Sequence, residues 1–286
     1  VLIIGSCDKV DENLIVIDDQ KIPVGIDTNS VFFVDSVIVN SKHVLLEDFT
    51  GHQCPNCPEW ALKAHDWAED NDHRLIIYSV HAGGYADLNP EEGYVIDFTT
   101  PTGDQLNGFF QITFNPSSLI NRAETNGGQV IPPPFWETTV NTELAKENTI
   151  DLKLKNIYYP NSNTLEIVVS AKFLTASTAK YKLVVFLVED HIESKQKNNN
   201  PDIGPTPDWD GYEQRNVLRD AVNGTFGGYV SSDGLIGTDS TYVNRFYYDT
   251  FDEDWELSNC NIIAYIFDEE TEEVLQVAEL GINTGD

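Results

Sequence analysis

Methionine is absent from the 286 residues of the sequence, and lysine and arginine are scarce. The 17 Lys and Arg residues stand against 47 Asp and Glu residues, so the formal net charge at pH 7 is −30. A surface this acidic repels polyanions, which makes nucleic acid and anionic lipid unfavourable partners. Because position 1 is not methionine, we expect that an amino-terminal segment precedes Val1.

Long apolar runs are also missing. No stretch approaches the roughly 18 apolar residues that a membrane-spanning helix needs, so the sequence predicts that any membrane attachment is through lipid. Hydrophobic residues nevertheless make up 41% of the chain and aromatic residues 11%, a composition typical of a folded protein. The length suits two domains, each able to bury a core.

Cysteine is rare, with four residues, and the first of them follows a run of apolar and small residues. Ile4, Gly5 and Ser6 match the apolar, small, small pattern of a bacterial lipobox, in which Cys7 is the residue that receives lipid. Residues 1–6 would then be the remnant of a signal sequence. The alternative is a short amino-terminal strand that ends at an incidental cysteine.

Residues 7–30 are acidic and rich in turn residues, and we interpret them as a tether. The cluster of Asp8, Asp11 and Glu12 resembles the acidic export signal that sends lipoproteins to the outside of the outer membrane in one large group of Gram-negative bacteria. Within the tether, Leu14–Ile17 predicts one short strand. A single acyl chain binds a membrane weakly, so stable anchoring would need several chains.

Residues 31–148 have the pattern of an α/β domain. Apolar residues spaced three and four apart predict a helix at 58–71, between two apolar segments that read as strands. The order strand, helix, strand implies a right-handed crossover and parallel pairing. The stretch 82–112 is rich in Gly, Pro and Asp, and loops this long tend to be functional. Strands are expected at 31–39, 43–49 and 74–81.

Residues 149–286 alternate apolar and polar side chains in segments separated by Asn, Gly, Ser and Pro. This pattern predicts an antiparallel β-sandwich of the immunoglobulin-like or jelly-roll type. The polar stretch 191–209 predicts a surface loop. The alternating segments are 149–159, 164–174, 181–190, 242–251, 260–268 and 273–280.

Cys54 and Cys57 stand three residues apart where an apolar strand gives way to a helix. Pro55 suits the first helical position, and the helix dipole would favour a thiolate at Cys54. Cys57 lies one turn later and could resolve a mixed disulfide formed by Cys54. The pair could instead be a structural disulfide, as is common in exported proteins. A metal site would need two more ligands, and the histidines in suitable elements are His52, His65 and His81.

The surroundings of this pair resemble the thioredoxin fold. Asp48, six residues before Cys54, matches the buried acid that helps deprotonate the resolving cysteine. Pro116, ahead of an apolar strand, matches the cis-proline that packs beside the sulfurs. The resemblance implies attack by Cys54 and resolution by Cys57. Asp48 would relay the proton, and Pro116 would shape the peptide site.

Two residues depart from those usual in active oxidoreductases: Gln53 before the first cysteine and Asn115 before the proline. Three stretches carry a wider resemblance: "LLEDFTGHQCPNCP" at 45–58, "RNVLRDAVNGTFGG" at 215–228 and "IIAYIFDEETEEVLQVAEL" at 262–280. Together they resemble the family of twenty-eight-kilodalton outer-membrane-protein-related surface lipoproteins. That resemblance implies a thioredoxin-like domain followed by a β-sandwich.

From these patterns we expect a lipid-anchored outer-membrane protein that faces the cell exterior. Its expected role is that of a non-catalytic binding or accessory subunit, with outer-membrane proteins or other surface lipoproteins as partners and no cofactor. One alternative is a thiol-disulfide oxidoreductase. Another is an adhesin that binds host or matrix molecules through the sandwich.

Two further features of the carboxy-terminal half are weaker signals. Asp208, Asp210 and Glu213 are candidate calcium ligands through their carboxylate oxygens, although their spacing is not that of an EF-hand. Acidic loops are also expected in a chain this negative. Cys260 opens an apolar segment and is interpreted as a buried small residue.

Overall fold

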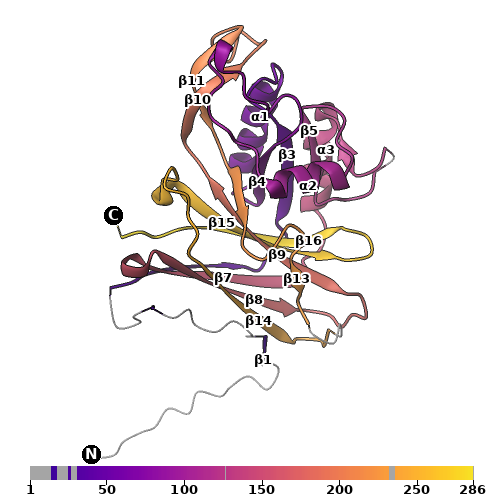
Figure 1. Cartoon of the computed structure of the whole chain (residues 1–286). Helices are drawn as coiled ribbons and strands as arrows, with labels where there is room; N and C mark the ends of the chain where they lie inside the picture. Colours follow the sequence, from indigo (N-terminus) through magenta and orange to yellow (C-terminus); the bar gives the residue numbers. More distant parts are fainter. Residues whose placement is uncertain (1–13, 18–24, 27–30, 126, 232–235, 286) are drawn as a thin grey trace, which may run out of the picture.

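The computed structural model describes residues 14–17, 25–26, 31–125, 127–231 and 236–285. The fold is mixed α/β and consists mostly of strands, which form a nine-stranded mixed sheet, a five-stranded sheet and a two-stranded hairpin. In Figure 1 the five-stranded sheet is the lower layer, and the helices gather around the upper part of the nine-stranded sheet. The α-helices among the described residues are α1 (Cys57–Asp70), α2 (Pro101–Phe109) and α3 (Trp136–Leu144). Short 3-10 helices occupy Pro90–Glu92, Pro133–Phe135, Pro160–Ser162 and Leu257–Asn259.

The five-stranded sheet is antiparallel except where β1 pairs in parallel with β14. Along β7 the buried residues Ile150, Leu152 and Leu154 alternate with more exposed ones, so one face of the sheet packs against a core. The order is β1 (Leu14–Ile17), β14 (Thr241–Tyr248), β8 (Thr164–Phe173), β7 (Ile150–Tyr159) and β2 (Phe33–Val39).

The nine-stranded sheet combines strands from both predicted domains. Strand β12 joins the two groups, because it pairs antiparallel with β9 and in parallel with β4 through Val217 and Ser79. The order along the sheet is β16 (Val274–Gly281), β15 (Cys260–Asp268), β9 (Tyr181–Glu189), β12 (Val217–Ala221), β4 (Leu75–His81), β3 (Val44–Thr50), β5 (Ser117–Ile120) and β6 (Val130–Ile131). The short strand β13 (Gly228–Tyr229) pairs with β9 at the side.

A separate sandwich domain is not clearly shown. Strands of residues 149–286 lie in both sheets, but one of these sheets continues through β12 into β4 and β3, and β2, expected in the amino-terminal domain, pairs with β7. The reason is visible in β9, which is apolar on both faces and must be covered on both. Leu183, Val185 and Leu187 face one core, and Val184, Phe186 and Val188 face another.

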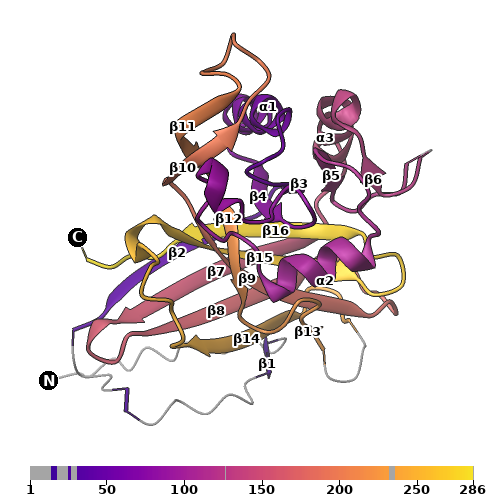
Figure 2. The ribbon, with the colours of Figure 1, turned by 45° about the horizontal axis from the view of Figure 1, so that its top comes forward.

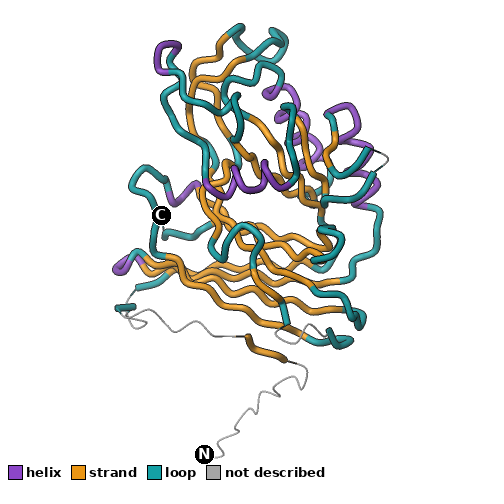
Figure 3. Tube along the Cα trace, turned by 45° about the vertical axis from the view of Figure 1, so that its right-hand side comes forward, coloured by secondary structure: helices purple, strands orange, loops and turns teal. Residues whose placement is uncertain are grey.

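Three apolar cores cover the nine-stranded sheet. One lies between β9, β15 and β16 and the five-stranded sheet, which Figure 3 shows as stacked strand layers. The second lies on the opposite face beneath α2, whose Leu106 is buried there together with Phe110. The third lies between β3 and β4 and helices α1 and α3, with Trp136 of α3 fully buried. Helix α2 contacts β4 and β12, and in Figure 2 it lies in front of the nine-stranded sheet.

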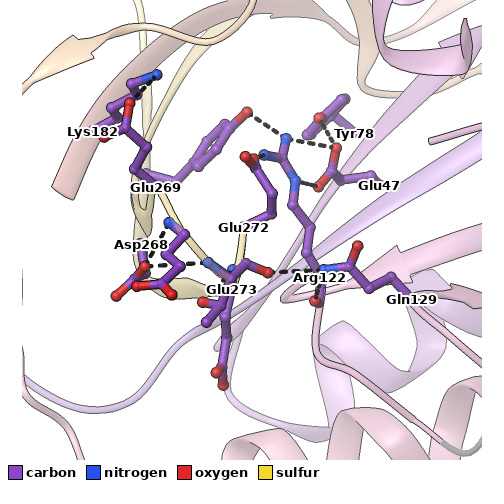
Figure 4. Close-up of polar contacts among 12 residues, drawn as sticks. Glu47, Tyr78, Arg122, Gln129, Lys182, Asp268, Glu269, Glu272 and Glu273 are labelled. Carbon is purple, nitrogen blue, oxygen red and sulfur yellow. Dashed lines mark hydrogen bonds and ion pairs between the residues drawn. The ribbon is translucent and has the colours of Figure 1, made fainter. Parts of the chain in front are cut away.

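A buried ionic network ties strands β3 and β4 to β15 (Figure 4). Arg122, which follows β5 and is 0% exposed, bonds Glu47 of β3 through Nε and Nη2, at 2.5 and 3.1 Å. Its Nη2 also donates to the Tyr265 hydroxyl of β15 at 2.9 Å, and the Tyr78 hydroxyl of β4 donates to Glu47. Glu272 lies 3.7 Å from Nη1. A buried charge is tolerated where it is paired and hydrogen-bonded, so this network links the two halves of the nine-stranded sheet.

Candidate functional site

Cys54 and Cys57 form a disulfide at the end of β3, with their Cα atoms 5.5 Å apart. Helix α1 begins at Cys57 and not at Cys54, and the preceding residues form a turn in which the Cys57 amide donates to the Cys54 carbonyl at 3.4 Å. Pro55 therefore lies in this turn, before the helix. Cys54 is 1% exposed and Cys57 2% exposed, so the disulfide is enclosed by the protein.

Pro116 lies beside this turn. The Asn115–Pro116 peptide bond is cis, the form that the thioredoxin resemblance implies. Strand β5 begins at the next residue, Ser117, which is opposite Phe49 of β3. The Asn115 side chain donates to the Thr50 carbonyl at 3.0 Å. This register brings the proline loop to the same end of β3 as the cysteine turn.

Asp48 lies on β3 below the disulfide and is buried, with 2% of its surface exposed. Its Oδ1 has no hydrogen-bond partner. Desolvation by burial raises the pKa of this carboxyl to about 7. Asp48, Cys57, Ser79 and Tyr212 line one small cavity. The structure therefore brings together the pair, the acid and the proline that the sequence singles out.

The stretch predicted as a surface loop forms instead a hairpin that covers the disulfide. Strand β10 (Ile192–Lys197) pairs with β11 (Asp208–Gln214). The Gln196 side chain, 2% exposed, donates to the carbonyl oxygens of Gly51 and Cys54, at 3.3 and 3.0 Å. The hairpin stands beside α1 in Figure 2. Polar residues form its buried face, so its strands lack the apolar alternation that predicts strands elsewhere.

Backbone hydrogen bonds attach the hairpin to the cysteine turn. The Lys197 amide donates to the His52 carbonyl at 2.8 Å, and the Asn199 amide donates to the Pro55 carbonyl at 2.9 Å. The buried Gln214 side chain in turn donates to Oε1 of Gln196 at 3.0 Å. Sequence reasoning missed these glutamines. The signal that was available is the alternation of uncharged Ser194 and Gln196 with charged residues in the segment 193–197.

The loop after β4 covers the cysteine turn from a second side. The Gln53 amide donates to the Tyr85 carbonyl at 2.9 Å, and the His52 ring contacts the Asp87 carbonyl at 2.8 Å. At Gly51 a Cβ atom would lie 2.4 Å from the carbonyl carbon of Tyr85, a distance that side chains do not adopt. Glycine at this position therefore allows the loop to approach the turn closely.

Ion pairs join the hairpin to this loop. Lys195 Nζ donates to the Glu92 carbonyl at 2.7 Å, and Lys197 lies 3.2 Å from the Glu92 carboxylate. The Tyr94 hydroxyl donates to Asp208 at 2.6 Å and, together with Lys195, lowers the pKa of that carboxyl. The hairpin and the loop thus form one continuous cover over the disulfide.

The candidate calcium ligands are engaged elsewhere or lie apart. Asp208 contacts Lys195 at 3.3 Å, whereas Glu213 pairs with Arg215 at 2.9 Å and Asp210 is exposed. Across the described ranges, no group of three His, Cys, Asp or Glu residues is placed to hold a metal ion.

Of the histidines proposed as metal partners, His65 lines the same small cavity as Cys57, and the His52 ring contacts the Asp87 carbonyl. His81 is buried, its ring nitrogens have no partners, and desolvation lowers its pKa to about 3. Desolvation likewise lowers the pKa of His65 to about 4. Cys260 is buried, and burial raises its thiol pKa to about 12. The lipidation candidate Cys7 lies outside the described residues.

Comparison with known proteins places the chain in a family. The family model described as "Outer membrane protein Omp28" matches residues 103–285. Because this match spans more than half of the sequence, the chain belongs to the Omp28 family. None of the curated proteins matches it. Among the part of the chain that the structure describes, no helix is long and apolar enough to cross a membrane.

Two solved structures are similar to the chain. A domain of the outer membrane lipoprotein Omp28 from Porphyromonas gingivalis is 22% identical, with 47% of this chain and 88% of that one covered and a TM-score of 0.31. A structural-genomics protein from Agrobacterium tumefaciens is 10% identical, with 86% of this chain and 97% of that one covered and a TM-score of 0.51. At this identity the second match shows a shared fold and nothing about activity.

Proposed function

We propose that this protein is an outer-membrane lipoprotein, anchored through Cys7 and facing the cell exterior, that acts as a non-catalytic binding or accessory subunit of an outer-membrane complex. Membership of the Omp28 family supports the location. The observation that carries the role is the burial of the Cys54–Cys57 disulfide under the β10–β11 hairpin.

Thiol-disulfide exchange requires an attacking thiolate to reach one of the sulfurs. Here both cysteines are at most 2% exposed, and the cover above them is held by backbone and side-chain hydrogen bonds. A disulfide enclosed in this way staples the cysteine turn to the start of α1. We also propose that residues 31–148 form a thioredoxin-like scaffold, residues 149–286 a β-sandwich domain and residues 7–30 an acidic tether.

Recovery of the intact protein from detergent-solubilised outer membranes tests this proposal. Mass spectrometry of the sample is expected to show at least one co-purifying outer-membrane protein and acyl chains on Cys7. A control in which Cys54→Ser and Cys57→Ser are combined should retain the same partner, provided that its urea midpoint shows a folded protein. Recovery of a lone monomer after mild extraction would contradict the accessory role.

The second candidate function is a thiol-disulfide oxidoreductase. Its supporting observation is Asp48, which has one carboxyl oxygen without a hydrogen-bond partner, lines the same cavity as Cys57 and has a pKa raised to about 7 by burial. An enzyme of this class would show a Cys54 thiol pKa well below about 8.5. Its disulfide would have a reduction potential above about −300 mV. Measurement of both quantities separates the two candidates.

A further inference from the structure

An apolar hollow lies at the outer edge of the nine-stranded sheet, away from the covered disulfide. Its volume is about 490 Å³. We call it the Phe114–Phe135 groove. The residues that line it and matter here are Phe114, Val130, Ile131, Pro132, Phe135 and Thr139.

Two aromatic side chains that line this groove are exposed. Phe114 is 45% exposed and Phe135 is 59% exposed. Phe114 also lines a neighbouring hollow of about 330 Å³, so two hollows flank one ring. Large apolar side chains gathered around a concavity mark interaction sites, whereas scattered ones do not.

The groove lies beside the last strand of the sheet. Among the described residues, β6 (Val130–Ile131) ends the strand order with β5 as its partner strand, and the Ile131 carbonyl accepts a hydrogen bond from Trp136 Nε1 at 2.8 Å. Figure 2 shows β6 beside β5 at the outer side of the molecule, next to α3. Exposed apolar side chains beside two hollows suit an extended polypeptide, which can place alternate side chains in the hollows.

Acidic residues near the groove indicate that a bound polypeptide would carry basic side chains. Residues 82–139, which supply every lining residue of both hollows, contain seven Asp and Glu residues, of which Glu92 pairs with Lys197, and one Lys or Arg, namely Arg122. Arg122 is 0% exposed and paired with Glu47, so it neutralises nothing at the surface. Glu124 and Glu137 are exposed and lie within two residues of the lining.

We propose that the Phe114–Phe135 groove binds an extended segment of a partner protein that carries apolar side chains flanked by Lys or Arg. The proposal rests on the accessory function proposed above and adds the site and the chemistry of the partner. A second copy of this chain is disfavoured because each copy carries a net charge of −30.

Fluorescence polarisation with labelled peptides tests the groove directly. The first probe carries one Leu and one Phe two positions apart, flanked by two Lys on each side. The second probe has Glu in place of each Lys, and the third has Ser in place of Leu and Phe. The first probe is expected to bind at least about tenfold more tightly than either of the others. Equal binding of the first and third probes would show charge attraction alone and would overturn the proposal.

Variants of the full chain locate the binding. Phe135→Ser should weaken binding of the first probe about tenfold, because it removes an exposed ring without touching the core. Ile38→Ser is the matched control, since Ile38 is 65% exposed but lies on β2 of the other sheet. Unchanged binding by Phe135→Ser would overturn the assignment to this groove.

The same variant distinguishes failure of the groove from failure of the accessory role. If wild-type protein recovers a partner from solubilised outer membranes and Phe135→Ser recovers equally much, the groove is wrong and the accessory role stands. If wild-type protein recovers no partner although the first probe binds selectively, the accessory role is wrong and the groove stands. If wild-type protein recovers a partner and Phe135→Ser does not, the result supports both the groove and the accessory role.

Discussion

At the scale of single residues, Asp48 and Arg122 are two buried charges that the protein treats in opposite ways. Arg122 is neutralised by Glu47 and bonded to Tyr265. Asp48 has one carboxylate oxygen without a partner. A buried carboxyl without compensation shifts its pKa upward because its charged form loses hydration. The two sites therefore respond differently to pH and to substitution.

The Asp48→Asn variant should change how stability depends on pH. Burial raises the pKa of Asp48 to about 7 from an ordinary value of 3.8. The folded protein therefore holds this proton at pH values where the unfolded chain has released it. Relative to the variant, the wild type should lose up to about 4 kcal/mol of unfolding free energy between pH 4 and 7. Urea unfolding at several pH values measures this difference.

A control for this experiment is Glu279→Gln, because desolvation also raises the pKa of Glu279 to about 7. The Glu279→Gln variant should lose the pH dependence of unfolding free energy that Glu279 contributes. It should keep the pH dependence that Asp48 contributes. A difference between wild type and Asp48→Asn that does not change from pH 4 to pH 7 would contradict the raised pKa.

Arg122→Met should destabilise the protein by about 3–5 kcal/mol, because it leaves the buried Glu47 carboxylate without its cation. Combining Arg122→Met with Glu47→Gln should cost much less than the sum of the two single changes. Urea unfolding of all four proteins measures the coupling. If the two changes in unfolding free energy are additive, the Arg122–Glu47 pair has no coupling energy, and this outcome would contradict the prediction.

At the scale of elements, the β10–β11 hairpin decides what the cysteine pair can do. It leaves the nine-stranded sheet at His191 and returns at Asn216, and both residues adopt positive φ, 59° and 49°. The chain thus turns away from β9, covers the disulfide and re-enters the sheet as β12. Hydrogen bonds from buried glutamines, together with the buried Tyr212 ring, hold its inner side.

Gln196→Ala should loosen this cover and expose the disulfide. The change removes the hydrogen bonds from Gln196 to the carbonyl oxygens of Gly51 and Cys54, which keep only their backbone donors, and it removes the acceptor of Gln214, so it should cost about 1–3 kcal/mol. Opening of the hairpin then becomes more frequent, so reduction by dithiothreitol under native conditions should accelerate about tenfold or more. Alkylation followed by mass measurement gives the rate.

The matched control is Glu193→Ala, a substitution at an exposed residue of the same strand. It should leave the reduction rate unchanged. Equal rates for wild type, Gln196→Ala and Glu193→Ala would show that the hairpin does not limit access to the disulfide.

At the scale of the whole molecule, the nine-stranded sheet joins segments that the sequence assigns to different domains. Tyr78 of β4 and Phe186 of β9 meet edge to face at 5.5 Å, and Leu45 of β3 belongs to the same core. Neither half can be removed without exposing that core to water.

The chain is therefore expected to unfold in a single transition. Tryptophan fluorescence and far-ultraviolet circular dichroism should give the same urea midpoint, because the shared core couples the two halves. The Arg122→Met variant weakens the link between the two halves of the sheet. In this variant the fluorescence and circular dichroism curves should therefore have different urea midpoints. Two well-separated transitions in the wild type would contradict this coupling.

Much of the local structure was predictable from sequence. The strands at 43–49 and 74–81 and the helix between them agree with β3, β4 and α1 to within a few residues, because apolar spacing records which face each element buries. The hairpin was missed, since Ser194, Gln196 and Gln214 are buried by hydrogen bonding and produce no apolar pattern.

By itself, the sequence determined the elements around Cys54 and Cys57 and the presence of Asp48 and Pro116 near them, because these depend on residues close in the chain or on one strand register. Only the tertiary structure decided that β12 pairs with β4, that a hairpin encloses the disulfide, and that Phe114 and Phe135 border one groove. These depend on contacts between residues distant in sequence, and apolar periodicity says which face of a strand is buried but not what buries it.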